Sequence, residues 1–425
     1  MFRKDIKSYC IMTQSIGDLG GSQLYTVRRI KHLLKRNIKV CVVAGSNDNF
    51  TLQKEFEGID ILIVPEINFL PSMFTKARWK SVVQKIVSFL QVNRYDVIES
   101  HSISTGVYAE LVSKQTKSKN IIYLLNEDKV KNEDGINFNN FFNFKLKRNE
   151  LFGVSSKSLE IILNRSLSEK ENNFINIPFD LEEISGNESL SIIDEVTGND
   201  ADLKILSIAR LDKTYLVNLI EEIIELAKER YDLEFLLVII GNSSDARILE
   251  SLKSRDPNLK NLAIFFPGYV HPIPSILFKK VDIFIGQGTA SVNSISQRCA
   301  TAIIDPRDNK SPGFLGVDTN NFGYPEKDVP NRSIKEILQQ VILDRNIISI
   351  AQEFGEKLFY SSYLSSSVMK DFDDKIIKSD MEIKYWDFIF IKSKRRIIEF
   401  LLIYIFGIKS FEIIFNKIVK WKSIK

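Results

Sequence analysis

Glycine-rich turns are the first candidates for chemistry in this sequence. Gly20, Gly21 and Ser22 stand in the run GDLGGS, between an apolar run and a stretch of helical period. Glycine lets a ligand approach the backbone closely, and the start of a helix offers free amide groups to an anion. The spacing differs from GxGxxG, which disfavours a dinucleotide site. An ordinary strand-to-helix turn is the alternative interpretation.

A second glycine turn, GQGTAS, follows the apolar run Val281–Ile285. It combines a flexible backbone with hydroxyl groups ahead of another helical pattern, and such a turn can cradle a diphosphate. The candidate residues in it are Gly288, Thr289, Ala290 and Ser291. Gly241 and Asn242 repeat this pattern more weakly after a different apolar run.

Two more strand ends carry a basic or imidazole side chain. Arg210 follows the run Leu203–Ala209, with Lys213 three residues on. A guanidinium suits phosphate because its planar fork donates two parallel hydrogen bonds, although a solvated surface pair is the alternative. His101, one of three histidines, follows Tyr95–Ser100. A neutral imidazole there can donate to a sugar hydroxyl or a leaving phosphate, while helix capping or packing is the alternative.

Metal and thiol chemistry have little support. Acidic pairs of DxD type occur at Asp200 and Asp202, in a polar stretch, and at Asp371 and Asp373, in a charged helical pattern. Neither position suits a metal site, so we expect no metal and no cofactor. Three widely spaced cysteines lie inside apolar runs and indicate buried thiols in a reducing cytoplasm: Cys10, Cys41 and Cys299.

These candidates need a scaffold that brings strand ends together. Short apolar runs alternate with amphipathic stretches of helical period, which is the pattern of parallel sheets with crossover helices. The expected strands are 8–15, 38–44, 59–64, 95–100, 120–125, 203–209, 234–240, 262–266, 281–285 and 300–304. The expected helices are 23–36, 79–91, 105–114, 216–230 and 246–254. Ligands of such sheets sit at the carboxyl ends of the strands.

The alternation runs twice, which predicts an α/β protein of two Rossmann-like, doubly wound domains with a cleft between them. The length of 425 residues agrees, since single cores stop growing at roughly 250–300 residues. We place the first domain at 1–185, a polar linker at 186–202 and the second domain at 203–360. A helical return segment and a basic tail follow at 361–425.

The charge distribution singles out the C-terminal tail. The net charge is +4, but residues 384–425 alone carry +7, which leaves −3 for the remainder. This distribution is not that of a nucleic-acid-binding protein. The apolar stretch Ile397–Ile408 is too short to span a bilayer but long enough to lie in its interface. We expect a cytoplasmic protein held peripherally on the inner face of the cell membrane; an ordinary packed terminal helix is the alternative.

The order of the motifs resembles the family 4 glycosyltransferases of the GT-B fold (glycosyl transferases group 1), over roughly residues 8–355. The segments that carry this resemblance are GGS at 20–22, DVIESHS at 96–102, FGVSSKS at 152–158, INIPFDLEE at 175–183, ILSIARLDK at 205–213, LLVIIGNSSD at 236–245 and FFPGYV at 265–270. His101 falls on the second histidine of the family segment DVIHSHS, and Glu99 on the first.

The resemblance implies transfer of a hexose-like sugar from a nucleotide-sugar donor, with retention of anomeric configuration and no metal. Arg210 and Lys213 would bind the donor diphosphate with Gly288–Ser291, and His101 would contact the reacting sugar. Gly20–Ser22, Gly241, Asn242 and Tyr269 would line the cleft. The segment 286–304 lacks the two donor-binding glutamates of the family, the second falling on Ser294 or Ile295, and the family's second basic residue falls on Tyr215.

Three functions follow from these observations. The first is a glycosyltransferase that acts on a saccharide or lipid-linked saccharide in cell-surface polysaccharide synthesis. The second is a non-catalytic subunit of the same fold that binds a partner glycosyltransferase or a glycan, which the missing glutamates favour. The third, a sugar-nucleotide epimerase, would share the cleft without needing the basic tail. The resemblance also implies that the end of the chain returns to the first domain, with Trp386 and Phe388 packing there.

Overall fold

The computed structural model describes residues 6–17, 20–48, 52–92, 94–125, 138–168, 171, 173–181, 190–243, 245–270, 273–323, 330–379, 382–388, 390, 403, 407 and 410. The chain forms two compact units. The first consists of Met1–Asn176 together with Met369–Lys425, and the second of Ile177–Val368.

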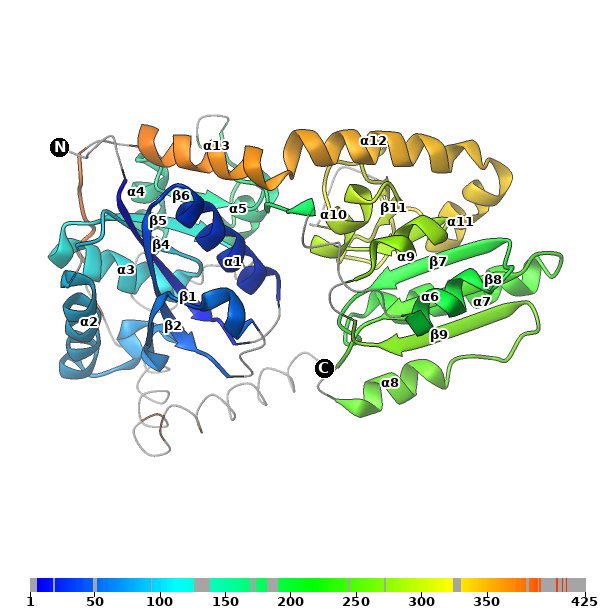
Figure 1. Ribbon diagram of the computed structural model, residues 1–425, viewed down its shortest axis with the longest axis horizontal. Helices are drawn as coiled ribbons and strands as arrows, with labels where there is room; N and C mark the ends of the chain where they lie inside the picture. Colours follow the sequence, from blue (N-terminus) through cyan, green and yellow to red (C-terminus); the bar gives the residue numbers. More distant parts are fainter. Residues whose placement is uncertain are drawn as a thin grey trace. The chain divides into compact units, whose positions relative to one another are not determined.

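The first unit is built on a six-stranded parallel sheet in the order β3-β2-β1-β4-β5-β6. Its strands are β1 Ser8–Ser15, β2 Lys39–Ser46, β3 Asp60–Ile63, β4 Val97–Ser100, β5 Lys119–Leu124 and β6 Leu151–Gly153. Helices α1 Gly21–Lys35, α2 Lys76–Gln91, α3 Ile103–Thr116, α4 Phe138–Lys147 and α5 Ser156–Leu163 cover the sheet (Figure 1). The central strands are almost entirely buried, as expected for a sheet covered on both faces.

The second unit repeats this topology, in the order β12-β11-β10-β7-β8-β9. Its strands are β7 Leu203–Ile208, β8 Phe235–Ile240, β9 Leu262–Gly268, β10 Ile283–Gly286, β11 Ala300–Ile303 and β12 Gly313–Phe314. Among the described strand pairs of this sheet, β12 pairs antiparallel with β11 and the others are parallel. Its helices are α6 Leu190–Thr197, α7 Tyr215–Glu229, α8 Ala246–Lys253, α9 Ser275–Lys280, α10 Thr289–Ser296, α11 Ile334–Leu343 and α12 Asn346–Ser362.

The doubly wound α/β architecture expected from the sequence is confirmed, with each predicted strand within a few residues of an observed one. One segment differs in structure from the expectation. Residues 190–197, inside the predicted linker, form α6, because Ile192, Ile193 and Val196 pack against the second sheet. The three cysteines are buried and free, as expected. No described helix is long and apolar enough to cross a membrane.

Helix α13, Ser365–Lys378, carries the chain into the first unit. The ring of Phe372 is fully buried and lies 4.8 Å from the Arg29 guanidinium of α1. Asp373 accepts hydrogen bonds from Arg29 at 2.8 Å and from His32 at 2.7 Å, and it also pairs with Arg36. The helix is therefore held by a buried ion pair as well as by apolar contact.

The return segment continues along the first unit, as the resemblance implied. The rings of Trp386 and Phe388 pack against Phe141, with centroids 6.5 and 4.8 Å away. The backbone amide of Trp386 donates to the buried carboxylate of Glu110 at 2.7 Å. Glu110 is also paired with the buried Lys145 at 2.6 Å, so its charge is compensated. The predicted tail at 392–425 lies outside the described residues except for three positions.

Asp373→Asn is expected to destabilise the first unit by about 2–4 kcal/mol, because the buried Arg29 loses one of its two carboxylates. Burial alone would raise the pKa of Asp373, but Arg29 and His32 lower it to about 2. A lowered pKa contributes stability above the ordinary value near 4, and this contribution is lost as the pH falls towards 2. The difference in the free energy of unfolding between wild type and variant, measured with urea, should therefore become smaller as the pH falls from about 4 towards 2.

The matched control for this prediction is Asp371→Asn on the same helix. Asp371 is 56% exposed and pairs with Lys375 at 2.8 Å. Exposed pairs of this kind contribute at most about 0.5 kcal/mol. Equal effects of the two substitutions would contradict the importance of the buried pair.

Candidate functional site

Both sheets change strand order at a central position, between β1 and β4 in the first unit and between β7 and β10 in the second. Loops at the carboxyl ends of such neighbouring strands diverge and leave room for a ligand. The sequence-derived candidates lie at these two edges. Gly20–Ser22 and His101 are in the first unit, whereas Arg210 and Gly288–Ser291 are in the second.

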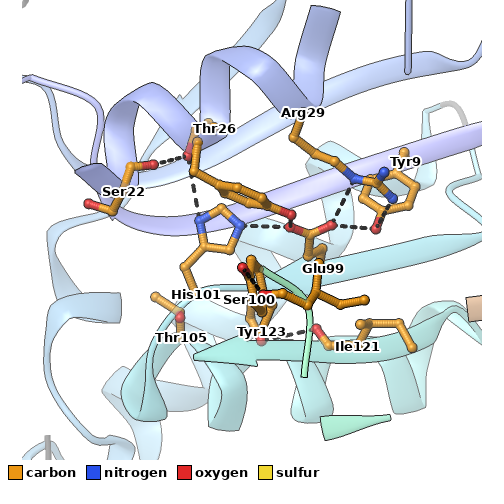
Figure 2. Close-up of polar contacts among 12 residues, drawn as sticks. Tyr9, Ser22, Thr26, Arg29, Glu99, Ser100, His101, Thr105, Ile121 and Tyr123 are labelled. Atoms are coloured by element: carbon orange, nitrogen blue, oxygen red, sulfur yellow. Dashed lines mark hydrogen bonds and ion pairs between the residues drawn. The ribbon is translucent and has the colours of Figure 1, made fainter. Parts of the chain in front are cut away.

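In the first unit, the start of α1 lies beside His101 (Figure 2). Gly20 is the N-cap of α1 and has an extended backbone without a side-chain cap. The Thr26 hydroxyl donates to the Ser22 carbonyl oxygen at 2.9 Å and lies 3.5 Å from His101 Nδ1. Thr26 of α1 and His101, 75 residues apart in sequence, are thus brought together by the pairing of β1 with β4.

The His101 side chain is held firmly and is only 3% exposed. Its Nε2 atom lies 2.9 Å from Glu99 Oε1, and its ring stands edge-on to Tyr25 at 5.1 Å. Because Glu99 is ionised, as its lowered pKa shows, Nε2 carries the hydrogen of this bond. Ser102 and Thr105 form a capping box that starts α3 directly after the histidine. The ring nitrogens therefore face Glu99 and Thr26.

Glu99 is the centre of a buried polar network (Figure 2). Its carboxylate accepts hydrogen bonds from Tyr9 at 2.5 Å, from Tyr25 at 2.7 Å and from Arg29 at 3.1 Å. Burial alone would raise the pKa of Glu99, but Arg29, His101 and Tyr9 lower it to about 2. Burial, reinforced by the nearby carboxylate, raises the pKa of both tyrosines well above the usual value. Both phenols therefore act as neutral donors.

The network was largely missed at the level of sequence, where Glu99 was noticed only as a departure from a family pattern. A signal was nevertheless present in α1. Tyr25, Arg29, His32 and Arg36 recur at spacings of four, three and four residues, which places them on one face of a helix. A polar stripe of this kind, in a helix that also has an apolar stripe, indicates a buried charge partner elsewhere.

The second-unit edge presents Arg210 to solvent. Its side chain is 74% exposed and contacts Asp212 at 3.3 Å. The backbone after it is fixed, since the Leu211 amide donates to the Asn242 carbonyl oxygen at 3.0 Å. Gly241 is required here because a Cβ atom would come within 1.8 Å of a carbonyl oxygen at the end of the neighbouring strand. Arg210 and Asn242 are therefore held at adjacent strand ends.

The start of α10 is the feature best suited to an anion. Gly288 is its N-cap, with a φ of +72° that favours glycine and no side-chain cap. The amide of Gly288 donates to the Phe322 carbonyl oxygen, but no described contact engages the amides of Thr289 and Ala290. The Ser291 hydroxyl, in the same turn, is fully buried and has no hydrogen-bond partner among the described atoms. Three donors thus remain available at this turn.

The position that lacks the family's second glutamate is occupied differently. Ser294 is fully buried, and its hydroxyl accepts a hydrogen bond from Thr301 at 2.8 Å. Ile295 is also fully buried and packs close to Gly355. Tyr269 is 54% exposed and follows Gly268 at the end of β9. Lys213 donates its backbone amide to the Arg210 carbonyl oxygen and starts the turn into α7.

Comparisons by sequence identify no relative. No protein-family model matches the chain, and no curated protein matches it either. Matches to known proteins come instead from comparison of three-dimensional structures.

Comparisons with solved structures find many matches. A glycosyltransferase from Rickettsia africae is 14% identical with a TM-score of 0.67, covering 88% of this chain and 99% of that one. HepE (Alr3699) from Anabaena, in complex with UDP and glucose, is 13% identical with a TM-score of 0.62, covering 88% and 100%. The lipopolysaccharide outer core galactosyltransferase WaaB is 13% identical with a TM-score of 0.53, covering 87% and 99%. With two six-stranded sheets of matching topology, this chain has the two-domain GT-B fold.

Proposed function

We propose that the protein is a glycosyltransferase that takes its sugar from a nucleotide-sugar donor. The observation that carries this proposal is the start of α10, where two amide groups and the buried hydroxyl of Ser291 lack partners among the described contacts. They lie one strand away from Arg210, at the edge where β7 and β10 separate. Structures of HepE, which has a similar fold, hold UDP and UDP-glucose, and this supports the same donor class here.

The chemistry of such a site follows from charge. When the bond between sugar and phosphate breaks, negative charge develops on the leaving diphosphate. Preorganised amide donors and a guanidinium stabilise that charge more strongly than they stabilise the uncleaved donor, and this difference lowers the barrier. Arg210 supplies the guanidinium and the turn Gly288–Ser291 the amides. With these groups present, transfer needs no divalent metal, and we propose that it retains the anomeric configuration.

We assign His101 a contact with the reacting sugar, from the Nδ1 edge of the ring that faces the Ser22–Thr26 turn. Its other nitrogen is committed to Glu99. The acceptor is proposed to be a saccharide or lipid-linked saccharide of a cell-surface polysaccharide, bound by the first unit.

A non-catalytic subunit is the second candidate, and one observation favours it. The segment 286–304, which includes α10, contains no carboxylate to bind donor hydroxyls. The buried Ser294 hydroxyl in this segment already accepts a hydrogen bond from Thr301. Such a subunit could bind a glycan or a partner enzyme without turnover. Binding of a nucleoside diphosphate together with release of that diphosphate from a nucleotide sugar would distinguish the enzyme from the subunit.

Arg210→Ala is expected to weaken the binding of a nucleoside diphosphate by about 1.5–3 kcal/mol, the range for a hydrogen bond to a charged group. The affinities of UDP, GDP and ADP would be measured by calorimetry. Arg230→Ala is the matched control, because Arg230 also pairs with a nearby aspartate, Asp232, but ends α7 at the opposite edge of the sheet. Failure of all three nucleotides to bind the wild type, or equal affinity in Arg210→Ala, would overturn the assignment.

Removal of divalent metal is expected to leave turnover unchanged, because positive charge at the diphosphate comes from Arg210 and the helix start. Release of nucleoside diphosphate from the preferred nucleotide sugar would be followed with and without EDTA. Activity abolished by the chelator and restored by Mn²⁺ would contradict this expectation. It would direct attention to acidic side chains such as Asp200 and Asp371, because Asp373 is already paired with Arg29.

We also propose that the basic segment Lys392–Lys425 holds the protein on the cytoplasmic face of an anionic membrane. Reversing three adjacent charges in the full chain, Lys394→Glu with Arg395→Glu and Arg396→Glu, should lower co-sedimentation with anionic vesicles, since each base near such a surface contributes about 1 kcal/mol. Binding should also weaken with salt. Unchanged co-sedimentation of a folded variant would refute a role for this segment.

A further inference from the structure

A second basic region lies in the first unit, in a different stretch of the sequence from the tail. Between Glu66 and Asp96 the chain contains five lysines and arginines and no acid: Lys76, Arg78, Lys80, Lys85 and Arg94. Four of these residues belong to α2, which has no acidic residue. This helix therefore carries a positive charge that its own sequence does not compensate.

The packing of α2 directs these side chains outward. One face buries five apolar residues in the core of the first unit: Val82, Val83, Ile86, Val87 and Leu90. With 3.6 residues per turn, Lys80 lies on one flank of the opposite face, and Arg78 and Lys85 on the other. Lys76 is exposed at the first position of the helix. The strip between them consists of small or uncharged exposed residues: Ala77, Ser81, Gln84 and Ser88. The bases thus border an uncharged strip on both sides.

Few of these charges have a partner. Arg78 contacts Glu66 at 3.1 Å and lies over the Phe74 ring at 5.6 Å. Lys85 donates to the Ile63 carbonyl oxygen at 3.4 Å. Among the contacts of the described residues, the ammonium groups of Lys76 and Lys80 have none. Stabilisation of the fold does not account for these two charges.

Apolar side chains accompany the bases. Val92, directly after α2, is 79% exposed, and Phe89 is half-buried. Trp79 meets Phe390 edge-on with ring centroids 5.3 Å apart, and Ile403 packs with Met73 and Phe74 just ahead of the helix. Phe390 and Ile403, the described residues on either side of 391–402, thus pack beside the start of α2. Cations beside apolar groups match the interface of a bilayer better than they match a nucleic-acid backbone.

We propose that the outer face of α2 binds the surface of an anionic lipid bilayer. The lysines contact lipid phosphates, and Val92 with its apolar neighbours meets the headgroup layer. This surface lies in the folded body and acts in addition to the tail. The proposal is independent of sugar transfer, because vesicle binding requires neither donor nor turnover.

The test uses the full chain with three substitutions, Lys76→Glu, Lys80→Glu and Lys85→Glu. Vesicles of phosphatidylcholine alone would be compared with vesicles containing about one third phosphatidylglycerol, by co-sedimentation at several salt concentrations. We expect the variant to partition onto anionic vesicles at least about tenfold less than the wild type, since each engaged base contributes on the order of fivefold. Neither protein should bind neutral vesicles strongly.

The control is a second full-length variant with the same change in charge, Lys228→Glu, Lys260→Glu and Lys279→Glu. These lysines are exposed on the second unit. The control should bind anionic vesicles like the wild type, which would separate a local surface from net charge. A milder variant, Lys76→Gln with Lys80→Gln, keeps good helix formers and serves if the triple variant fails to fold.

Three results would overturn the proposal. The first is equal vesicle binding by wild type and a folded α2 variant. The second is equal loss in the control variant, which would show that only net charge matters. The third is a wild type that ignores anionic vesicles but binds a single-stranded polynucleotide through α2, which would identify a different partner.

Discussion

The guanidinium of Arg29 is a full charge without contact with water, and the first unit is arranged to neutralise it. Its side chain is entirely buried, between Glu99 of β4 at 3.1 Å and Asp373 of α13 at 2.8 Å. An uncompensated ion in such a place costs several kcal/mol, so α1, β4 and α13 must assemble together or not at all. The rings of Tyr9 and Phe372, each within 5 Å of the guanidinium, close off the remaining solvent.

This constraint extends to the candidate site. The carboxylate that neutralises Arg29 is also the one that holds His101, and both tyrosines bonded to it remain neutral because burial raises their pKa. The orientation of the imidazole therefore depends on the same charge balance that docks α13. A network with every partner in place is rigid, and the loss of one member leaves a buried polar atom unsatisfied. In the first unit, this network lies beside the strand edge and fixes the His101 ring there.

The second unit has the same strand order, but the groups at its strand edge differ from those in the first unit. At the corresponding edge Arg210 is mostly exposed, and the start of α10 keeps two amides and one buried hydroxyl without partners among the described atoms. An edge of this kind has donors ready for an anion, whereas in the first unit Tyr9, Tyr25 and Arg29 already donate to the Glu99 carboxylate. This contrast is the physical reason for placing the donor diphosphate on the second unit.

The sequence by itself determined the positions of ten of the twelve described strands, the two doubly wound units and the glycine turns at their edges. These features follow from local periodicity and from the backbone freedom of glycine, as in the run GQGTAS after β10. Only the tertiary structure decided the rest. Arg29 and Asp373 are 344 positions apart, and no local pattern links them. Residues 190–197 became a helix because sheet packing outweighed their polar surroundings. Whether the Ser291 hydroxyl has a partner likewise depends on neighbours brought from distant segments.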